Sequence, residues 1–356
     1  MRWILERLPA PSPSRWPAAT VIVPVKGADE GLAENLASLA ALDYPDFELI
    51  VAARRLEDIP RGVVPPRARV VIGGEGDAAN GEKINNLLAA VASARPESEV
   101  LAFADSDGCV RKDWLRALVA ALEEPGAGAA SGYRWHVPVH GGFWSLLRSV
   151  WNAVIAGAFS PGGARFAWGG AMAIRRADFT AFRVPDFWHG AISDDYRLTE
   201  AVRRAGRRIA YAPAALVAAL DHTTAREFFA WTRRQMMITR FYSPGLWWIA
   251  LAAHVIYCAA MTASLVLLLR GSAPAGAALL VQLGAGMIKG RNRLKVARAA
   301  LPQQAGALRR RGWVHIWWTP LATWAWLAAL AASSFGGTVR WRGRVYRLSR
   351  GKATIG

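Results

Sequence analysis

Two aspartates that follow an apolar segment are the residues with the clearest capacity for chemistry. Residues 99–114 read EVLAFADSDGCVRKDW, so the apolar segment 100–104 leads directly into Asp105 and Asp107. In a strand or a tight turn, residues i and i+2 point to the same side. Two such carboxylates repel each other unless a cation lies between them, and oxygen ligands favour Mg²⁺ or Mn²⁺. Asp-Ser-Asp-Gly is also ordinary turn chemistry, so this stretch alone leaves both interpretations open.

A second acidic pair, Asp194 and Asp195, begins a helix-like segment in SDDYRLTEAVRRAGRRIAY. Acidic residues at a helix start are common because they cap the helix and favour its dipole. Just upstream, WGGAMAIRR contains Gly169 and Gly170, which allow close approach of the backbone to a ligand. A carboxylate that faces a substrate hydroxyl there would serve as a general base.

Basic and amide side chains add phosphate-binding potential. NGEKINN places Lys83, Asn85 and Asn86 at an expected helix start, where a nucleotide or phosphate is favoured. Residues 226–242, REFFAWTRRQMMITRFY, mix arginines with aromatics. This segment fits a juxtamembrane helix bound to anionic lipid, and it also fits an arginine clamp for a diphosphate leaving group. Neither G-x-x-x-x-G-K-[ST] nor G-x-G-x-x-G occurs, which disfavours ATP and dinucleotide binding.

The surrounding elements predict an α/β fold. Apolar strands are expected in four segments: 20–27, 47–53, 68–74 and 99–105. Helices are expected over 31–42 and 83–94. This alternation predicts βαβ units and a mostly parallel sheet, in which ligands bind beyond the carboxyl ends of the strands. Asp105 and Asp107 occupy such an end, which favours a functional site over a plain turn.

Composition favours a protein that touches lipid over a soluble nucleic-acid binder. The chain has 356 residues, a formal net charge of +18, 53% hydrophobic residues and 17 Trp. The charge suits an anionic membrane surface or substrate, and Trp favours the membrane interface. Two cysteines predict neither a disulfide framework nor a metal cluster. No nucleic-acid or protein partner is expected, and residues 1–19 are expected to form an irregular lead-in.

The C-terminal part predicts membrane helices. Residues 246–269 lack Lys, Arg, Asp and Glu and are long enough to span the hydrocarbon. Residues 272–288 and 313–335 are expected as further spans, although a buried helical hairpin remains open for both. Basic residues lie both before and after 313–335, and the positive-inside rule places both stretches on the cytoplasmic side. We therefore expect either a re-entrant segment broken at Pro320 or an interfacial one.

The expected organisation follows from these segments. A nucleotide-binding α/β domain is predicted over 20–243, a membrane region over 244–338 and a basic tail over 339–356. The expected location is the cell (inner) membrane, multi-pass, with the α/β domain in the cytoplasm. Residues 141–163 are apolar and aromatic, and they fit an interfacial lid or a plain core helix equally well.

The ordered motifs resemble those of ceramide glucosyltransferases, which are similar to inverting family 2-like glycosyltransferases with a GT-A fold. The segments that carry the resemblance are PVKGADEGLAENLASLAALDYPDFELIVA, GEKINNL, DSD, WGGAMAIRRADF, SDDYRLTEAVRRAGRRIAY, the arginine-rich segment and VRWRGRVYRL. The match runs from about residue 21 to 348. Single motifs are weak, but the ordered set is specific.

The resemblance implies roles for particular residues. Asp105 and Asp107 match the motif in which Mg²⁺ or Mn²⁺ bridges the carboxylates and the UDP diphosphate, and Asp195 matches the candidate base for the acceptor hydroxyl. Residues implied in nucleotide-sugar binding are Pro24, Glu57, Asp58, Lys83, Asn85, Asp105, Gly169 and Gly170. Residues implied in a diphosphate or acceptor clamp are Asp194, Trp231, Arg233, Arg234 and Gln235.

Two positions depart from the family pattern. Arg234 and Gln235 resemble a variant of (Gln/Arg)-x-x-Arg-Trp, with Gln235 where Trp is usual and Trp231 at the first position. After the second strand the family carries a nucleoside-associated aspartate, and Arg55 stands there. The nucleoside contact would then pass to Glu57 or Asp58, or the donor would differ.

The resemblance implies inverting transfer of a hexose, with glucose expected, from a UDP-sugar to the hydroxyl of a membrane lipid such as ceramide. Its alternatives are transfer to a hopanoid or another bacterial lipid, for example of N-acetylglucosamine, and processive polysaccharide synthesis. A non-enzymatic alternative is a lapsed membrane scaffold that binds nucleotide or lipid. Arg55 and Gln235 favour that last alternative, whereas the intact Asp105, Asp107 and Asp195 oppose it.

Overall fold

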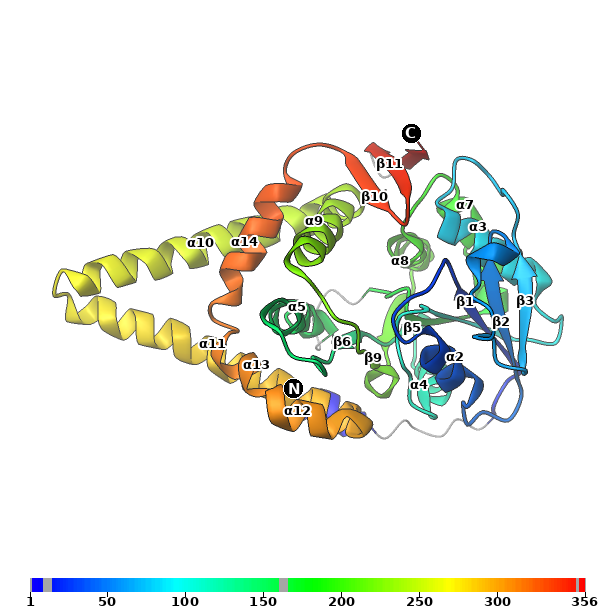
Figure 1. Cartoon of the computed structure of the whole chain (residues 1–356), viewed down its shortest axis with the longest axis horizontal. Helices are drawn as coiled ribbons and strands as arrows, with labels where there is room; N and C mark the ends of the chain where they lie inside the picture. Colours follow the sequence, from blue (N-terminus) through cyan, green and yellow to red (C-terminus); the bar gives the residue numbers. More distant parts are fainter. Residues whose placement is uncertain (1, 9–14, 160–165, 350–351, 356) are drawn as a thin grey trace. The chain divides into compact units, whose positions relative to one another are not determined.

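The structure is a computed structural model that describes all residues except 1, 9–14, 160–165, 350–351 and 356 (Figure 1). The described residues divide into two compact units. The first, called here the sheet unit, consists of Arg2–Trp135, Ala158–Asp221 and Arg340–Gly356. The second, called the helical unit, consists of His136–Gly157 and His222–Val339. The residues of the proposed lid that lie at 160–163 fall outside the described residues.

The sheet unit is built on a seven-stranded sheet with the order β3-β2-β1-β4-β7-β5-β8. Its strands are β1 (Ala19–Pro24), β2 (Phe47–Ala53), β3 (Ala68–Ile72), β4 (Val100–Ala104), β5 (Ala127–Ser131), β7 (Ala171–Arg175) and β8 (Arg208–Tyr211). β7 is antiparallel to β4 and β5, and the pairs β1–β2, β2–β3, β1–β4 and β5–β8 are parallel. The predicted mostly parallel α/β sheet is therefore confirmed.

Local sequence explains these elements. β1, β2 and β4 are nearly continuous apolar runs with buried side chains, as expected for parallel strands covered on both faces. The helices of this unit are α1 (Arg2–Glu6), α2 (Leu32–Ala40), α3 (Glu82–Ser93), α4 (Trp114–Leu122), α6 (Arg176–Ala181), α7 (Val184–Trp188) and α8 (Asp194–Arg204). α2 and α4 place leucines at helical spacing into one core with the sheet. The expected strands and helices of residues 20–105 are thus all present.

Two small sheets complete the strands. β6 (Arg134–His136) pairs with β9 (Val217–Ala219). β10 (Thr338–Trp341), β11 (Arg344–Ser349) and β12 (Lys352–Ile355) form a three-stranded sheet near the C-terminus. Residues 340–356 belong to the sheet unit, so the segment expected as a separate basic tail is part of the α/β unit.

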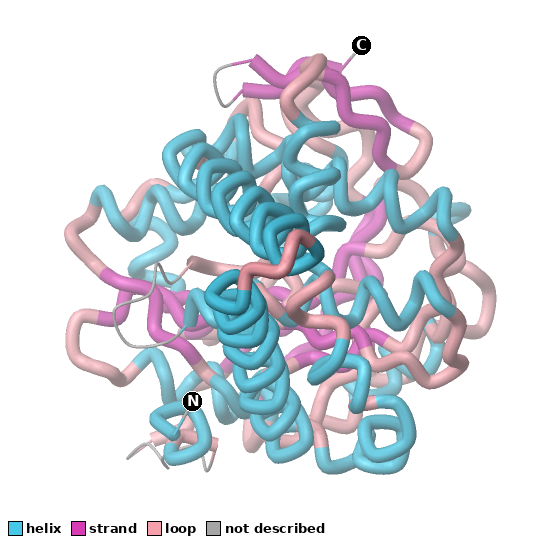
Figure 2. Tube along the Cα trace, turned by 90° about the vertical axis from the view of Figure 1, so that its left-hand side faces the viewer, coloured by secondary structure: helices cyan, strands magenta, loops and turns pink. Residues whose placement is uncertain are grey.

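The helical unit contains two long helices and several shorter ones. They are α5 (Phe143–Ala153), α9 (Ala225–Tyr242), α10 (Pro244–Leu269), α11 (Ala273–Ala300), α12 (Ala305–Arg311), α13 (Trp313–Trp317) and α14 (Ala322–Ser333). α10 and α11 lie side by side, and the Tyr257 hydroxyl of α10 donates to the Gln282 carbonyl of α11 at 3.0 Å (Figure 2). In α5, Trp151 is fully buried and stacks on Trp326 of α14, which fits the core-helix interpretation of this helix.

The expected span over residues 313–335 is not confirmed, because these residues do not form one continuous helix. The chain there is divided between α13 and α14, with Pro320 in the turn between them. This turn approaches α11 closely, because a Cβ at Gly286 would lie 2.8 Å from the Pro320 Cβ and one at Gly290 would lie 1.7 Å from the His315 carbonyl oxygen. Within the described part of the chain, α10 is the one helix long and apolar enough to cross a bilayer. The expected span over 272–288 forms the first part of α11.

Candidate active site

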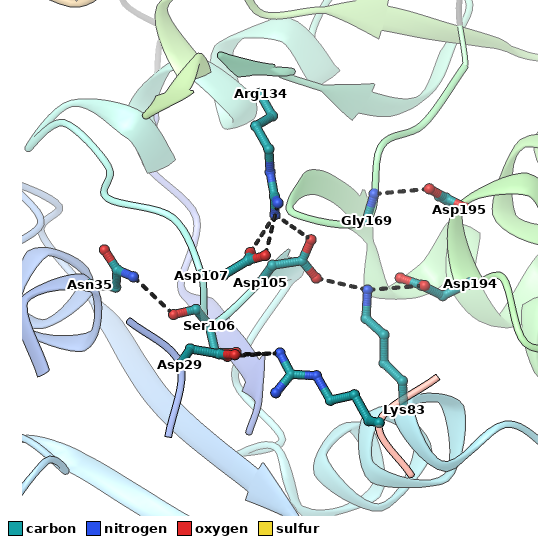
Figure 3. Close-up of polar contacts among 11 residues, drawn as sticks. Asp29, Asn35, Lys83, Asp105, Ser106, Asp107, Arg134, Gly169, Asp194 and Asp195 are labelled. Atoms are coloured by element: carbon teal, nitrogen blue, oxygen red, sulfur yellow. Dashed lines mark hydrogen bonds and ion pairs between the residues drawn. The ribbon is translucent and has the colours of Figure 1, made fainter. Parts of the chain in front are cut away.

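The carboxyl end of β4 carries Asp105 and Asp107, as the sequence predicted. The loop that holds them is fixed from two sides, since Asn35 donates to the Ser106 carbonyl at 3.0 Å and the Ser106 hydroxyl donates to Asp29 at 2.6 Å (Figure 3). Asn35 lies on α2, and Asp29 lies in the loop between β1 and α2. These contacts turn the backbone so that both carboxylates face one guanidinium.

That guanidinium belongs to Arg134 of β6. Its Nη1 lies 2.8 Å from Asp107 Oδ2 and its Nη2 lies 3.1 Å from Asp105 Oδ2 (Figure 3). The guanidinium carbon lies 4.8 Å from the centre of the Trp168 ring, and the side chain is 10% exposed. Burial alone would lower the pKa of Arg134, but Asp107 and Asp105 more than offset it, so the pKa lies above its usual value. Arg134 was not among the site residues predicted from the sequence.

Lys83, in the first turn of α3, joins the two acidic pairs. Its Nζ lies 2.9 Å from Asp105 Oδ1 and 3.0 Å from Asp194 Oδ1 (Figure 3). Burial opposes the charge on Lys83, whereas the two carboxylates favour it and raise its pKa above the usual range. Burial likewise opposes ionisation of Asp105, but Lys83 and Arg134 lower its pKa overall. The sequence prediction that Lys83 belongs to the site agrees with this arrangement.

The carboxylates of Asp194 and Asp195 have different surroundings. Asp194 is 3% exposed, and its buried Oδ2 atom has no hydrogen-bond partner among the residues that the structure describes. Burial raises the pKa of Asp194 to about 6, although Lys83 opposes the shift. Asp195 Oδ1 accepts from the Tyr196 amide at 2.7 Å and from the Ser193 hydroxyl, and Oδ2 accepts from the Gly169 amide at 3.4 Å. Asp195 thus helps to cap α8 while it accepts from Gly169 (Figure 3).

The glycine pair is required by the side chains around it. A Cβ at Gly169 would lie 2.7 Å from Asp194 Oδ2 and 2.8 Å from Lys83 Nζ. A Cβ at Gly170 would lie 2.7 Å from Asp105 Oδ2 and 2.1 Å from the Trp168 ring. The close approach that the sequence suggested for a ligand is therefore made by the protein's own carboxylates and lysine.

Other predicted nucleotide-binding residues have separate surroundings. Pro24 ends β1, and Glu57 and Asp58 lie in a short 3₁₀ turn after β2 (Leu56–Asp58), at the carboxyl end of the sheet. Arg55 lies 3.6 Å from Asp58, whose buried Oδ2 lacks a hydrogen-bond partner.

The Asn85 side chain forms hydrogen bonds with the loop before α3. Its amide donates to the Asp77 carbonyl at 2.9 Å and the Glu75 carbonyl at 3.4 Å, and its oxygen accepts from Asn80 at 3.0 Å. This side chain therefore holds residues 75–80 in place, and its predicted contact with nucleotide has no support in the geometry.

The clamp residues predicted between positions 231 and 235 lie on α9, in the helical unit. Trp231 packs against the Trp151 ring with a centroid distance of 5.2 Å. Arg233 donates to the carbonyls of Ala332 and Phe335 at 3.2 and 3.3 Å. Arg234 and Gln235 occupy the same helix, and the Gln235 carbonyl accepts from Thr239. Their clamp role remains a prediction.

The site offers two carboxylate ligands for a divalent cation, which is fewer than such an ion needs. Asp105 and Asp107 converge on a cationic group, Arg134, and carboxylates are suitable ligands for Mg²⁺ or Mn²⁺. Across the described residues, no group of three or more His, Cys, Asp or Glu side chains is arranged to hold a metal ion. The remaining ligands of such an ion would come from phosphate oxygens and water, as is usual for Mg²⁺.

The chain is similar to known glycosyltransferases in structure and in sequence. Among solved structures, a mannosyltransferase from Pyrobaculum calidifontis in complex with GDP-Man and Mn²⁺ is 20% identical, with 93% of this chain and 92% of that chain covered and a TM-score of 0.47. Glucosyl-3-phosphoglycerate synthase from Mycobacterium tuberculosis, in complex with Mn²⁺, UDP and phosphoglyceric acid, is 18% identical over 62% of this chain and 76% of that chain, with a TM-score of 0.43. Because these identities and TM-scores are low, the family is assigned from the sequence. The sequence model of glycosyl transferase family 21 matches residues 1–354. The chain therefore belongs to glycosyl transferase family 21, the ceramide glucosyltransferase family that its motifs resemble.

Proposed function

We propose that this glycosyltransferase moves glucose from UDP-glucose to a hydroxyl of a membrane lipid such as ceramide, with inversion at the anomeric carbon. The observation that carries the proposal is the partly buried set of paired charges at the carboxyl end of the central sheet, formed by Asp105, Asp107, Arg134, Lys83 and Asp194. Such an edge is where α/β sheets bind ligands, and family membership supplies the reaction class.

The charges suit a nucleotide diphosphate. Lys83 and Arg134 are paired with carboxylates, and the phosphate oxygens of a donor would compete with those carboxylates for the two cations. Asp105 and Asp107 would hold Mg²⁺ or Mn²⁺, which supplies charge neutralisation of the leaving UDP. Glu57 or Asp58, beyond the end of β2, would contact the nucleoside.

Asp195 is the proposed general base. It takes the proton of the acceptor hydroxyl while that oxygen bonds to the anomeric carbon, and the bond between that carbon and the phosphate oxygen breaks to release UDP. Asp194 acts through Lys83, because its carboxylate holds the lysine Nζ at 3.0 Å. We assign Asp194 as a positioning residue. Arg233, Arg234 and Gln235 of α9 remain the proposed contacts to diphosphate or acceptor.

The proposed acceptor is a lipid because α10 has the character of a membrane helix. Its side chains of Trp248, Ile249, Ile256 and Leu269 are 63%, 68%, 68% and 79% exposed. A helix of 26 residues is about 39 Å long, which is enough to cross the hydrocarbon. We propose that the chain resides in the cell membrane with the sheet unit in the cytoplasm, where UDP-sugars are available.

The test uses membranes that carry the wild type, Asp195→Asn or Asp186→Asn. Asp186 is a matched control because its carboxylate lies on α7 and pairs with the exposed Arg183. Each membrane is supplied with radiolabelled UDP-glucose, UDP-GlcNAc or UDP-galactose, with Mg²⁺ or Mn²⁺, and lipids are extracted. We expect label from UDP-glucose in lipid for the wild type and Asp186→Asn, and a loss of at least about 100-fold for Asp195→Asn.

Other outcomes contradict parts of this proposal. Label in lipid from another donor would correct the sugar, and label in insoluble polymer would indicate a polysaccharide synthase. Equal transfer by Asp195→Asn and the wild type would exclude Asp195 as the base. Mass spectrometry of the labelled lipid distinguishes ceramide from other acceptors.

A further inference from the structure

The C-terminal hairpin formed by β10 and β11 brings an arginine to the edge of the candidate site. The two strands are joined by Arg342 and Gly343, whose φ angles are +48° and +79°. Two positive φ angles in a two-residue loop are typical of a type I′ turn, where Asn and Gly are the favoured residues. Arginine at the first position is strained, so its side chain calls for an explanation.

The Arg342 guanidinium is bound to the loop after β1. It donates to the Lys26 carbonyl at 2.6 Å and to both oxygens of Asp29 at 2.7 and 2.8 Å. Asp29 in turn accepts from Ser106, the residue between Asp105 and Asp107. A single carboxylate therefore links the hairpin to the loop that carries the candidate metal ligands.

The rest of the hairpin is anchored independently of Arg342. Arg344 Nε lies 2.7 Å from Glu82 Oε2, and Tyr346 is 3% exposed with its hydroxyl near the Glu82 amide. Glu82 directly precedes Lys83 in the first turn of α3. The hairpin is therefore held on the sheet unit by these contacts, while the Arg342 side chain remains 32% exposed.

The Arg342 guanidinium lies among negatively charged side chains. Burial opposes the charge on Arg342, but its hydrogen bonds to Asp29 and the negative charges of Asp29, Asp107 and Asp105 raise its pKa. A guanidinium that pairs in bidentate fashion with a carboxylate has the geometry to pair with phosphate. Asp29 thus occupies the place that a phosphate group would take.

We infer that Arg342 binds the diphosphate of the nucleotide-sugar, and that Asp29 holds its guanidinium in position until the donor arrives. This inference rests on the proposed function, because it assigns a residue to the same donor site. The strained turn serves to present this one side chain. The C-terminal hairpin is accordingly part of the donor site.

The experiment measures UDP and uridine binding to the full-length chain in detergent, with Mn²⁺ present, by calorimetry. Arg342→Asn keeps a residue that suits the turn and removes the guanidinium. We expect UDP to bind at least about 10-fold more weakly, uridine to bind unchanged, and the thermal midpoint to stay the same or rise. Arg347→Asn removes an equal charge from an exposed position on β11 and is expected to bind UDP like the wild type.

Asp29→Asn separates a binding role from a structural one. Asparagine keeps an oxygen for Ser106 but holds Arg342 less firmly, so UDP affinity should stay equal or increase. If Arg342 only fastens the hairpin, Asp29→Asn and Arg342→Asn should both lower the thermal midpoint and weaken UDP binding together, and the inference is then wrong.

Three further results would overturn the inference. They are an unchanged UDP affinity for Arg342→Asn, an equal loss for Arg347→Asn, and an absence of UDP binding by the wild type. The lipid-labelling assay judges the proposed function separately, because it reports transfer and not nucleotide affinity.

Discussion

At the scale of residues, the site is organised around a lysine that holds two carboxylates from different elements. Lys83 contacts Asp105 after β4 and Asp194 at the start of α8. The Asp105 side chain is partly exposed and that of Asp194 is buried, and their pKa values shift in opposite directions, downward for Asp105 and to about 6 for Asp194. Burial raises the pKa of both acids, but Lys83 and Arg134 together outweigh it at Asp105, whereas at Asp194 burial exceeds the effect of Lys83 and Asp195 adds a negative neighbour.

The raised pKa of Asp194 predicts a pH-dependent stability. In the folded state its pKa is about 6, and its ordinary value is 3.8, so the native protein binds this proton more tightly than the unfolded chain. The contribution of Asp194 to stability therefore falls as pH rises through this window. We expect the thermal midpoint of the wild type to fall relative to that of Asp194→Asn between about pH 4 and pH 6, and the difference to level off above it.

The matched control is Asp186→Asn, whose melting curve should shift in parallel with the wild type across the same range. Parallel curves for Asp194→Asn and the wild type would show that Asp194 titrates as an ordinary surface acid. The measurement is differential scanning fluorimetry in detergent at a series of pH values.

At the scale of elements, helix starts and strand ends explain most of the architecture. α9 begins with a capping box, in which the Thr224 hydroxyl accepts from the Glu227 amide and the Glu227 carboxylate accepts from the Thr224 amide at 2.8 Å. α8 begins with Ser193, whose side chain accepts from the Tyr196 amide. Local sequence alone specifies both starts.

The capping box predicts a measurable cost. Thr224→Ala removes the hydroxyl that caps α9 and should lower the free energy of unfolding by about 1 kcal/mol, seen as a lower thermal midpoint. Thr224→Ser retains the hydroxyl and should resemble the wild type. An unchanged midpoint for Thr224→Ala would mean that α9 begins elsewhere under the conditions measured.

Sequence predicted the strands and the acidic pairs because their signals are local. Apolar β-branched runs identify β1 and β2, and Asp105 and Asp107 are adjacent along the chain. Arg134 and Arg342 could not be found this way, since each lies on a short strand or turn whose place depends on pairing with distant residues. The sequence allowed a break at Pro320 within residues 313–335, but it could not reveal that the chain there lies against Gly286 and Gly290 of α11.

At the scale of the whole molecule, the break between α13 and α14 removes a difficulty of topology. A segment that is broken at Pro320 need not cross the bilayer, so the basic residues before and after it can both lie on the cytoplasmic side. α11 has 28 residues, and its apolar first part ends at Lys289. We propose that α10 crosses the bilayer and that α11 brings the chain back.

Membrane insertion of α10 can be tested by placing one charged side chain in the middle of the helix. Ile256 is 68% exposed, and Ile256→Arg should reduce the fraction of protein that stays with membranes after alkaline carbonate extraction, because arginine at the centre of a span costs about 3 kcal/mol. Ile72→Arg, at a site 48% exposed on β3, is the matched control and should stay in the membrane like the wild type. Equal extraction of all three proteins would contradict a spanning α10.

One consequence follows from the way Arg134 and Lys83 occupy the strand-end carboxylates. Asp105 and Asp107 carry their own counter-ions before any ligand arrives. A bare divalent ion would have to compete with both cations, whereas a nucleotide brings phosphates that can accept the displaced guanidinium and ammonium groups. Under the proposed function, we therefore expect the divalent ion and the nucleotide to bind together, because the phosphates would take over the guanidinium and ammonium groups that now neutralise the carboxylates.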